Sequence, residues 1–185
     1  RLEELRDYHY YFQFTLTGYD RDIEPAIPSK KDQLIPAFRR LSEAVGKEKV
    51  IWGYDPILLT SRYTVEYHIK TYQEMAEALS GYTEKSVISF LDVYRKIEKS
   101  IKELGMRPPD ADEIEEMAGK MGEAARSFGI KIESCAEKTD LEKFGISHGS
   151  CIDKELIQRI TGREIKSKKD KNQRPECGCA ESVDA

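Results

Sequence analysis

Four cysteines are the residues of this chain whose type and spacing most clearly suggest chemistry. All lie in the last third of the sequence, at Cys135, Cys151, Cys177 and Cys179, and the last two form a Cys-Gly-Cys pair. In an α/β pattern with no secretory leader, gathered thiols favour a metal or cluster site over a disulfide framework. The spacing is not that of a standard zinc finger, which uses tight Cys-x2-Cys pairs. The cysteines therefore predict a shared thiolate site of a less common kind.

The alternative is four separate reduced thiols, two of them packed as small apolar side chains. Gly178 favours the shared site, because glycine lets the two flanking thiolates turn toward one ion. His148 stands three residues before Cys151 and is a further candidate, as a ligand or as the partner of one. The residues alone do not distinguish between an iron–sulfur cluster and a zinc ion as the group that the cysteines bind.

Composition limits the class of protein. The 185 residues suit one compact domain, and 39% hydrophobic with 35% charged residues is a globular balance with a well-solvated surface. The net charge of −4 does not indicate a nucleic-acid binder, and no apolar run approaches the roughly 20 residues that span a bilayer. Without a leader we expect the cytoplasm as the compartment. The opening residue, Arg1, predicts an internal piece of a longer protein.

Hydrophobic periodicity predicts alternating strands and helices. Strands are expected over 10–17, 49–52, 86–92 and 130–134, and helices over 31–45, 64–80, 94–105 and 110–128, with a short helix after Asp153. This alternation predicts parallel strands with helical crossovers, an α/β fold of the partial (β/α) TIM-like barrel type. We assign residues 1–162 to the partial barrel and 163–185 to a basic, cysteine-containing C-terminal segment of the same domain. No G-x-G-x-x-G run and no P-loop occurs.

Polar residues follow the predicted strands where barrel enzymes build their sites. Tyr54 and Asp55 follow the second strand, Asp92 follows the third, and Glu133 lies at the end of the fourth. Carboxylates that converge at this edge could bind a ligand or a cation, or transfer protons. The alternative is that each one caps a helix or pairs with a loop Lys or Arg. A metal-dependent hydrolase or isomerase is a third reading, but it would need histidine ligands at the strand ends.

Several longer motifs resemble a bacterial family, domain of unknown function 1848. They are Tyr-Tyr-Phe-Gln-Phe-Thr-Leu-Thr over 10–17, Val-Ile-Trp-Gly-Tyr-Asp-Pro-Ile over 50–57, Val-Ile-Ser-Phe over 87–90, Ser-Cys-Ala-Glu over 134–137, His-Gly-Ser-Cys-Ile-Asp over 148–153, and the run over 169–179 that ends in Cys-Gly-Cys. The resemblance covers essentially the whole chain, and its last motif is specific.

The resemblance implies a radical S-adenosylmethionine-like protein, similar to the spore photoproduct lyase type, with an iron–sulfur cluster and S-adenosylmethionine as cofactors. It implies that Tyr54, Asp55, Asp92 and Glu133 line a cofactor pocket and that the four cysteines hold a second metal centre or brace the chain. Family members usually carry a Cys-x3-Cys-x2-Cys set just after the Cys-x-Cys pair, so this chain is expected to stop before its cluster motif and to be inactive alone. Gly53 stands where the resemblance expects an Arg. A non-catalytic zinc-binding module is the alternative reading of the cysteines.

Overall fold

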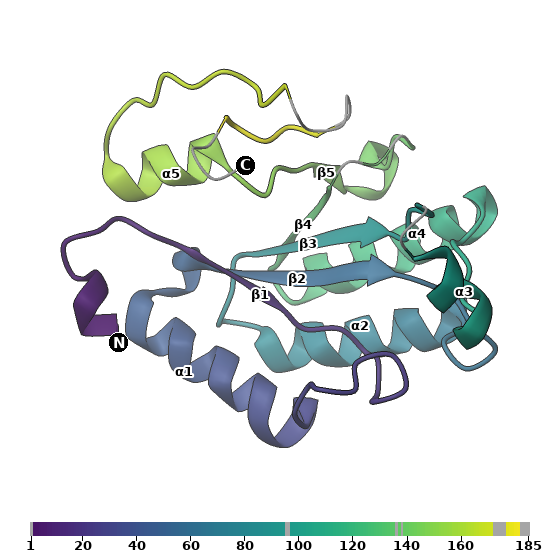
Figure 1. Ribbon diagram of the computed structural model, residues 1–185. Helices are drawn as coiled ribbons and strands as arrows, with labels where there is room; N and C mark the ends of the chain where they lie inside the picture. Colours follow the sequence, from purple (N-terminus) through teal and green to yellow (C-terminus); the bar gives the residue numbers. More distant parts are fainter. Residues whose placement is uncertain (1, 95–96, 136, 138, 172–176, 182–185) are drawn as a thin grey trace.

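The computed structural model describes residues 2–94, 97–135, 137, 139–171 and 177–181. Five parallel strands form one sheet in the order β1-β2-β3-β4-β5, which is also their order in the sequence (Figure 1). The strands are β1 Phe12–Thr15, β2 Val50–Ile57, β3 Lys85–Phe90, β4 Lys131–Ser134 and β5 Ser147–His148. Each strand therefore lies beside the one before it, which is how consecutive units of a (β/α) barrel are arranged. The expected α/β fold with parallel strands is confirmed.

Helices cover one face of this sheet. The crossovers are α1 Ile35–Val45, α2 Val65–Leu79 and α4 Ala111–Ser127, and α2 packs against α4. The opposite face carries α5 Lys154–Thr161 and the described part of the C-terminal segment, residues 163–171 and 177–181, which Figure 1 shows above the strands. The remaining helices are α3 Glu98–Leu104, η1 Leu2–Leu5, η2 Lys30–Leu34, η3 Lys47–Lys49 and η4 Glu142–Phe144. The face under α5 is the one that would point inward in a barrel.

Local sequence signals explain where the main helices begin. Asp110 accepts a hydrogen bond from the backbone N–H of Glu113, and the Glu113 carboxylate accepts one from Asp110 N, so the two residues form a capping box at the start of α4. Thr64 caps α2 and Asp153 caps α5 in the same way through their side-chain oxygens. Each of these three side chains therefore stands directly before the first residue of its helix.

Three expectations differ from the structure. The second strand, expected over 49–52, is Val50–Ile57, so Tyr54 and Asp55 lie within it and do not follow it. The helix expected over 94–105 is only Glu98–Leu104, and it buries none of its side chains. The short strand β5 was not expected, since two residues leave no readable alternation. Its neighbours identify it instead, because Glu133 pairs with Ser147 and Ser134 pairs with His148.

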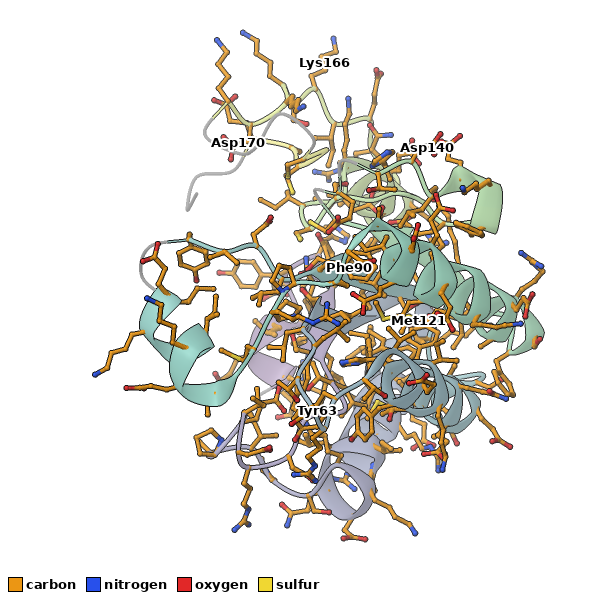
Figure 2. All side chains as sticks on the ribbon, turned by 90° about the vertical axis from the view of Figure 1, so that its right-hand side faces the viewer. Tyr63, Phe90, Met121, Asp140, Lys166 and Asp170 are labelled. Atoms are coloured by element: carbon orange, nitrogen blue, oxygen red, sulfur yellow. The ribbon has the colours of Figure 1, made fainter. Side chains whose placement is uncertain are left out.

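The main core lies between the sheet and its three crossover helices. Trp52 and Tyr54 of β2 are fully buried there, and the Trp52 ring stacks on Tyr72 of α2 with centroids 4.7 Å apart. The Trp52 indole N–H donates to the carbonyl of Leu16 at 2.9 Å, which ties β2 to the end of β1. Because side chains alternate along a strand, Ile51, Gly53 and Asp55 face the α5 side instead. Figure 2 shows this packing from the side, with Met121 and Tyr63 among the inner side chains.

Within the described residues, no helix is both long and apolar enough to cross a membrane.

Candidate functional site

Backbone contacts bring the cysteine-bearing segments together. Cys135 directly follows β4, and its N–H donates to Ile88 O of β3 at 2.9 Å. The carbonyl of Cys151 accepts from Tyr11 Oη at 2.6 Å and from the side-chain amide of Gln13. Residues from the N-terminal strand region therefore hold the backbone of a cysteine that lies 140 positions further along the chain.

The Cys-Gly-Cys segment docks beside Cys151. The N–H of Ala180 donates to Ile152 O at 3.1 Å, and the N–H of Asp170 donates to Cys179 O at 3.0 Å. Lys169 and Ala180 form an antiparallel bridge. Residues 177–181 thus lie between the 151–153 segment and the 168–170 segment, which orients both terminal cysteines toward the sheet edge. The stretch 172–176 of the predicted motif, like Ala136 of the earlier one, lies outside the described residues.

All four cysteines line one cavity of about 510 Å³. The sulfurs of Cys135 and Cys151 are 3.4 Å apart, and the N–H of Cys179 lies 3.4 Å from Cys177 Sγ. Polar lining comes from Ser89 and Asp92. The cavity lies where β3 and β4 end, which is the edge that carries ligand sites in parallel α/β sheets. Its apolar walls are Pro56, Phe90, Leu91, Tyr94, Ile97 and Ile152.

The thiols influence each other's protonation. The hydrogen bond from the Cys135 thiol lowers the pKa of Cys151 to about 7, so Cys151 carries a large thiolate fraction at neutral pH. The pKa of Cys135 is raised, first by that same hydrogen bond and then by burial and by the charges of the other three cysteines. Burial raises the pKa of Cys179 to about 11. Cys135, Cys151 and Cys179 therefore influence one another's charge, and ionisation of one disfavours ionisation of its neighbours.

The four sulfurs line the same cavity, but they do not surround one common point. Among the described residues, no three cysteine, histidine or carboxylate side chains are placed to hold a single ion. The 3.4 Å between the sulfurs of Cys135 and Cys151 is near the spacing of two ligands on one metal, because a tetrahedral site with metal–sulfur bonds of about 2.3 Å places its sulfurs about 3.8 Å apart. Their separation also exceeds the roughly 2.05 Å of a disulfide, so both are free thiols here.

Two of the four residues predicted to line a cofactor pocket lie at or near the cavity. Asp92 is part of its lining. Asp55 faces the same side of the sheet, close enough for its charge to act on Cys151, and burial raises the pKa of its carboxyl group. A Cβ on Gly53 would come within 2.6 Å of Asp55 Oδ1, so the glycine leaves room for this carboxylate along the strand.

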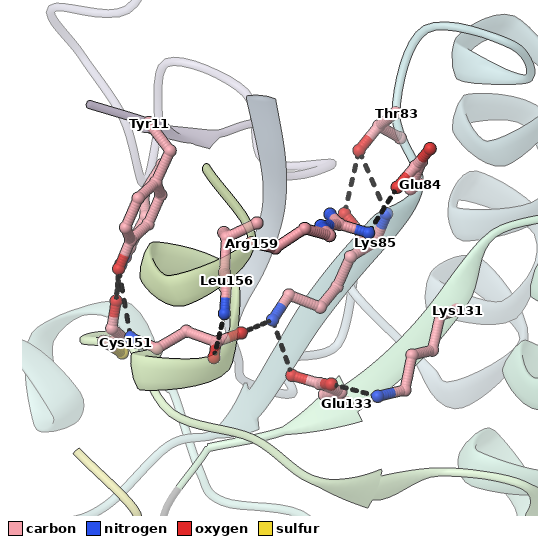
Figure 3. Close-up of polar contacts among 11 residues, drawn as sticks. Tyr11, Thr83, Glu84, Lys85, Lys131, Glu133, Cys151, Leu156 and Arg159 are labelled. Carbon is pink, nitrogen blue, oxygen red and sulfur yellow. Dashed lines mark hydrogen bonds and ion pairs between the residues drawn. The ribbon is translucent and has the colours of Figure 1, made fainter. Parts of the chain in front are cut away.

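Tyr54 and Glu133 lie elsewhere. Tyr54 points into the core on the helix side, where its hydroxyl lies 2.9 Å from His68 Nδ1. Glu133 pairs with Lys85, the first residue of β3, at 3.0 Å and with Lys131 at 2.6 Å (Figure 3). It lines a separate cavity of about 320 Å³ under α5. The structure does not bring either residue to the cysteines.

The sequence reading missed the carboxylate that does stand at the end of β4. Glu137 accepts a hydrogen bond from Phe90 N at 2.9 Å, and burial raises its pKa while the charge of the nearby His148 opposes the rise. Its position in the sequence could have identified it, because Glu137 follows the end of β4 by three residues and Asp92 follows the end of β3 by two. Tyr11 and Gln13 were also missed, since nothing local marks a strand residue as the anchor of a distant cysteine.

The fold and the site define a class: an α/β protein of consecutive strand–helix units with four cysteines at the carboxyl edge of its sheet. The chain matches the family model described as Domain of unknown function (DUF1848) over residues 1–185. The protein belongs to this family, as its motifs predict. No curated protein and no solved structure matches the chain.

Proposed function

We propose that this chain holds a thiolate-ligated metal centre through Cys135, Cys151, Cys177 and Cys179, and that its parent is an iron–sulfur protein of the radical S-adenosylmethionine type. The observation that carries the proposal is that all four cysteines of the sequence line one cavity. They come from three separate segments, after β4, after β5 and near the C-terminus. Packing alone gives no reason for every thiol in a chain to meet at one place.

The chemistry of the donors suits a soft metal. Thiolates select zinc, copper(I) and iron–sulfur clusters. Cys151 already has its pKa lowered to about 7, so it offers a ligand in the required charge state. A metal cation would reverse the mutual repulsion that raises the pKa of Cys135, because it favours the deprotonated form of each ligand. Binding would also draw the sulfurs closer together, because no three of them surround a common point in this structure.

The cavity favours an iron–sulfur cluster over a single zinc ion. A structural zinc site closes tightly on one ion with four ligands and leaves no space beside them. Here a cavity of about 510 Å³ adjoins the sulfurs and is walled mainly by apolar side chains. Such walls limit the access of water, one of the factors that set the potential of a cluster. Zinc held by the same four cysteines, in a non-catalytic module, is the second candidate.

The chain's own part in the parent protein is then to place and shield this centre. An iron–sulfur cluster would supply electron-transfer chemistry when bound. The sequence contains no Cys-x3-Cys-x2-Cys set, so we assign to these residues the second centre and not the cluster that binds S-adenosylmethionine. Tyr11 and Gln13 hold the backbone of one ligand, while Asp55 and Asp92 place carboxylates beside it. Asp55 and Asp92 are proposed to face the cofactor.

Metal analysis of anaerobically purified protein tests this proposal. Iron and acid-labile sulfide in equal amounts, lost in Cys151→Ser and in Cys179→Ser, would support the cluster. About one zinc per chain without sulfide would support the second candidate. Ser150→Ala is the matched control, because it changes the neighbouring residue and keeps every sulfur. Metal at background level in the wild-type protein, or metal that survives both Cys→Ser changes, would refute the centre.

A further inference from the structure

Cys135 and Cys151 lie close enough to react with each other. Their sulfurs are 3.4 Å apart, whereas the sulfurs of a disulfide are about 2.05 Å apart. The two atoms therefore need to approach by only about 1.4 Å, which small rotations of the two side chains achieve. The cysteines come from different segments, one after β4 and the other after β5. The pair thus has the arrangement of a reduced disulfide as well as that of two metal ligands.

Backbone hydrogen bonds hold both cysteines in this arrangement. The N–H of Cys135 donates to Ile88 O at 2.9 Å, and β4 and β5 pair directly before the two cysteine positions. On the other side, Tyr11 Oη donates to the carbonyl of Cys151 at 2.6 Å. Because groups other than the thiols fix both main chains, the short distance between the sulfurs is part of the fold. Forming a bond between them orders little additional chain.

This pair is also more accessible than the Cys-Gly-Cys pair. Cys135 and Cys151 are partly exposed and line the cavity of about 510 Å³. Cys177 and Cys179 line the same cavity, but each is only 4% exposed. The thiol of Cys179 hydrogen-bonds to that of Cys151, which makes Cys179 the competing partner. A small oxidant that enters the cavity therefore reaches Cys135 and Cys151 before the two buried sulfurs.

We propose that Cys135 and Cys151 form a reversible disulfide with glutathione disulfide as the oxidant, and that this bond releases the metal centre. One cysteine thiol attacks glutathione disulfide, whose S–S bond breaks, and one reduced glutathione leaves. The second thiol then displaces the other glutathione and completes the protein disulfide. Two electrons pass from the cysteines to the two glutathione sulfurs, and each of these takes up one cysteine proton. An excess of reduced glutathione reverses both steps.

The release of the metal rests on the proposed function, whereas the bond itself requires no metal. A disulfide sulfur is no longer a thiolate, and it is the thiolate that binds a metal. The bond would therefore withdraw two of the four proposed ligands and leave only Cys177 and Cys179. A bound metal would in turn protect the sulfurs of Cys135 and Cys151 from oxidation. Occupancy of the centre would thus follow the redox state of the surroundings.

Peptide mapping of the metal-free chain tests the bond. The chain is reduced, freed of metal with a chelator, equilibrated without air at several ratios of glutathione disulfide to glutathione, alkylated and digested with trypsin. Cys135 then lies in peptide 132–138, Cys151 in peptide 144–154, and both remaining cysteines in peptide 172–185. We expect two of the four thiols to escape alkylation, with the first two peptides joined and two hydrogen atoms lost. No protein disulfide at any ratio, or a main product that includes peptide 172–185, would overturn the proposal.

Two serine variants identify the partners. Cys179→Ser removes the competing thiol and keeps both proposed partners, so the ratio for half-conversion should stay within about twofold of the wild-type value. Cys135→Ser leaves Cys151 with the buried Cys179 as its partner, so half-conversion should need a ratio at least about tenfold higher. Equal shifts in the two variants would refute the assignment. The wild-type peptide map remains decisive if either variant fails to fold.

The metal content of the same samples separates this proposal from the preceding one. We expect the metal-loaded chain to lose its metal in step with the appearance of the joined peptides. The disulfide in a chain whose reduced form binds no metal would refute the centre and leave the bond standing. Metal binding without any disulfide after chelation would refute the bond and leave the centre standing. Metal that stays in chains with the Cys135–Cys151 bond would refute the release of the centre.

Discussion

The hydroxyl of Tyr11 donates to the carbonyl oxygen of Cys151 at 2.6 Å, across 140 residues of sequence. The hydroxyl oxygen of Tyr11 in turn accepts from the N–H of Asp153 at 3.1 Å, so one side chain holds both backbone groups that flank Ile152. Tyr11→Phe keeps the ring and removes both bonds. We expect it to cost about 1–3 kcal/mol of unfolding free energy, because it leaves a part-buried N–H unpaired, and to weaken metal binding about 10-fold to 100-fold.

Denaturant unfolding and a chelator competition measure the two effects. Tyr10→Phe is the matched control, since the Tyr10 ring packs edge-on against Phe12 and the change keeps that contact. If Tyr10→Phe and Tyr11→Phe lower metal affinity equally, Tyr11 has no special role in placing Cys151.

Lys85 binds the N-cap residue of α5 and so holds the start of this helix against the sheet. Its ammonium lies 3.0 Å from Glu133 and 2.5 Å from Asp153, the N-cap of α5 (Figure 3). Burial opposes the charged form, but the hydrogen bonds to the two carboxylates outweigh it and raise the pKa of Lys85. Lys85→Met leaves two carboxylates facing each other with little solvent. We expect a loss of about 3–5 kcal/mol, measured by urea unfolding.

The second step of that experiment is the double variant Lys85→Met with Glu133→Gln. It should regain part of the loss, because it removes the repulsion between the Glu133 and Asp153 carboxylates, although it also ends the Glu133 pair with Lys131. Lys70→Met supplies the control, since the Lys70 pair with Glu74 is exposed and such pairs contribute about 0.3–0.5 kcal/mol. A loss in Lys85→Met no larger than in Lys70→Met would show that the network does not hold α5.

His68 gives the fold a dependence on pH. It is fully buried between Leu58 O at 2.8 Å and the Tyr54 hydroxyl at 2.9 Å, and burial lowers its pKa from the ordinary value of 6.5. The folded state therefore binds fewer protons than the unfolded chain below pH 6.5. By linkage the unfolding free energy must fall as the pH drops through this range.

The His68→Gln variant tests this assignment. Urea unfolding at pH 7.5 and pH 5 should show a smaller difference between the two pH values than in the wild-type protein. His9→Gln changes an exposed histidine and should keep the full difference. A wild-type-sized difference in His68→Gln would mean that other groups cause the acid sensitivity.

The sequence predicts the fold more completely than it predicts the site. Periodicity located the helices well because Val65, Tyr72 and Leu79 recur on one buried face of α2, and caps such as Asp110 marked where helices begin. The side to which a strand residue points was harder to read. Tyr54 and Asp55 are adjacent, yet they face opposite sides of β2, so only Asp55 lies near the cysteines.

Glu133 shows the second limit. The sequence places it at the end of a strand, and the structure shows that β4 ends one residue later, at Ser134, with Glu133 turned toward Lys85. No local pattern predicts this partner, because Lys85 lies 48 residues away at the start of β3. The meeting of the cysteines in one cavity could be anticipated from their types, whereas the anchors that create it, Tyr11 and Gln13, belong to long-range contacts.

The same Gly→Ala substitution at two positions of α4 should change the stability of the fold in opposite directions. A Cβ on Gly122 would come within 2.4 Å of the backbone carbonyl oxygen of Phe144, which cannot swing aside. A Cβ on Gly119 would lie 3.6 Å from the Phe144 ring, an ordinary contact. We expect Gly122→Ala to destabilise the fold by about 1–3 kcal/mol and Gly119→Ala to stabilise it by up to about 1 kcal/mol.

Thermal or urea unfolding of the two variants checks the signs. Because the clash would push η4 and the β5 segment outward, Gly122→Ala should also loosen the approach to Cys151. Stabilisation by both substitutions would show that α4 and residue 144 lie further apart than described.

The most direct measurement is the number of sulfur atoms around the bound metal, obtained by X-ray absorption spectroscopy of the anaerobically purified chain. The account predicts a centre whose protein ligands are four cysteine sulfurs at about 2.3 Å, and a lower sulfur count or no bound metal in each single Cys→Ser variant. A metal coordinated mainly by nitrogen and oxygen, or a wild-type chain that binds no metal at all, would contradict it.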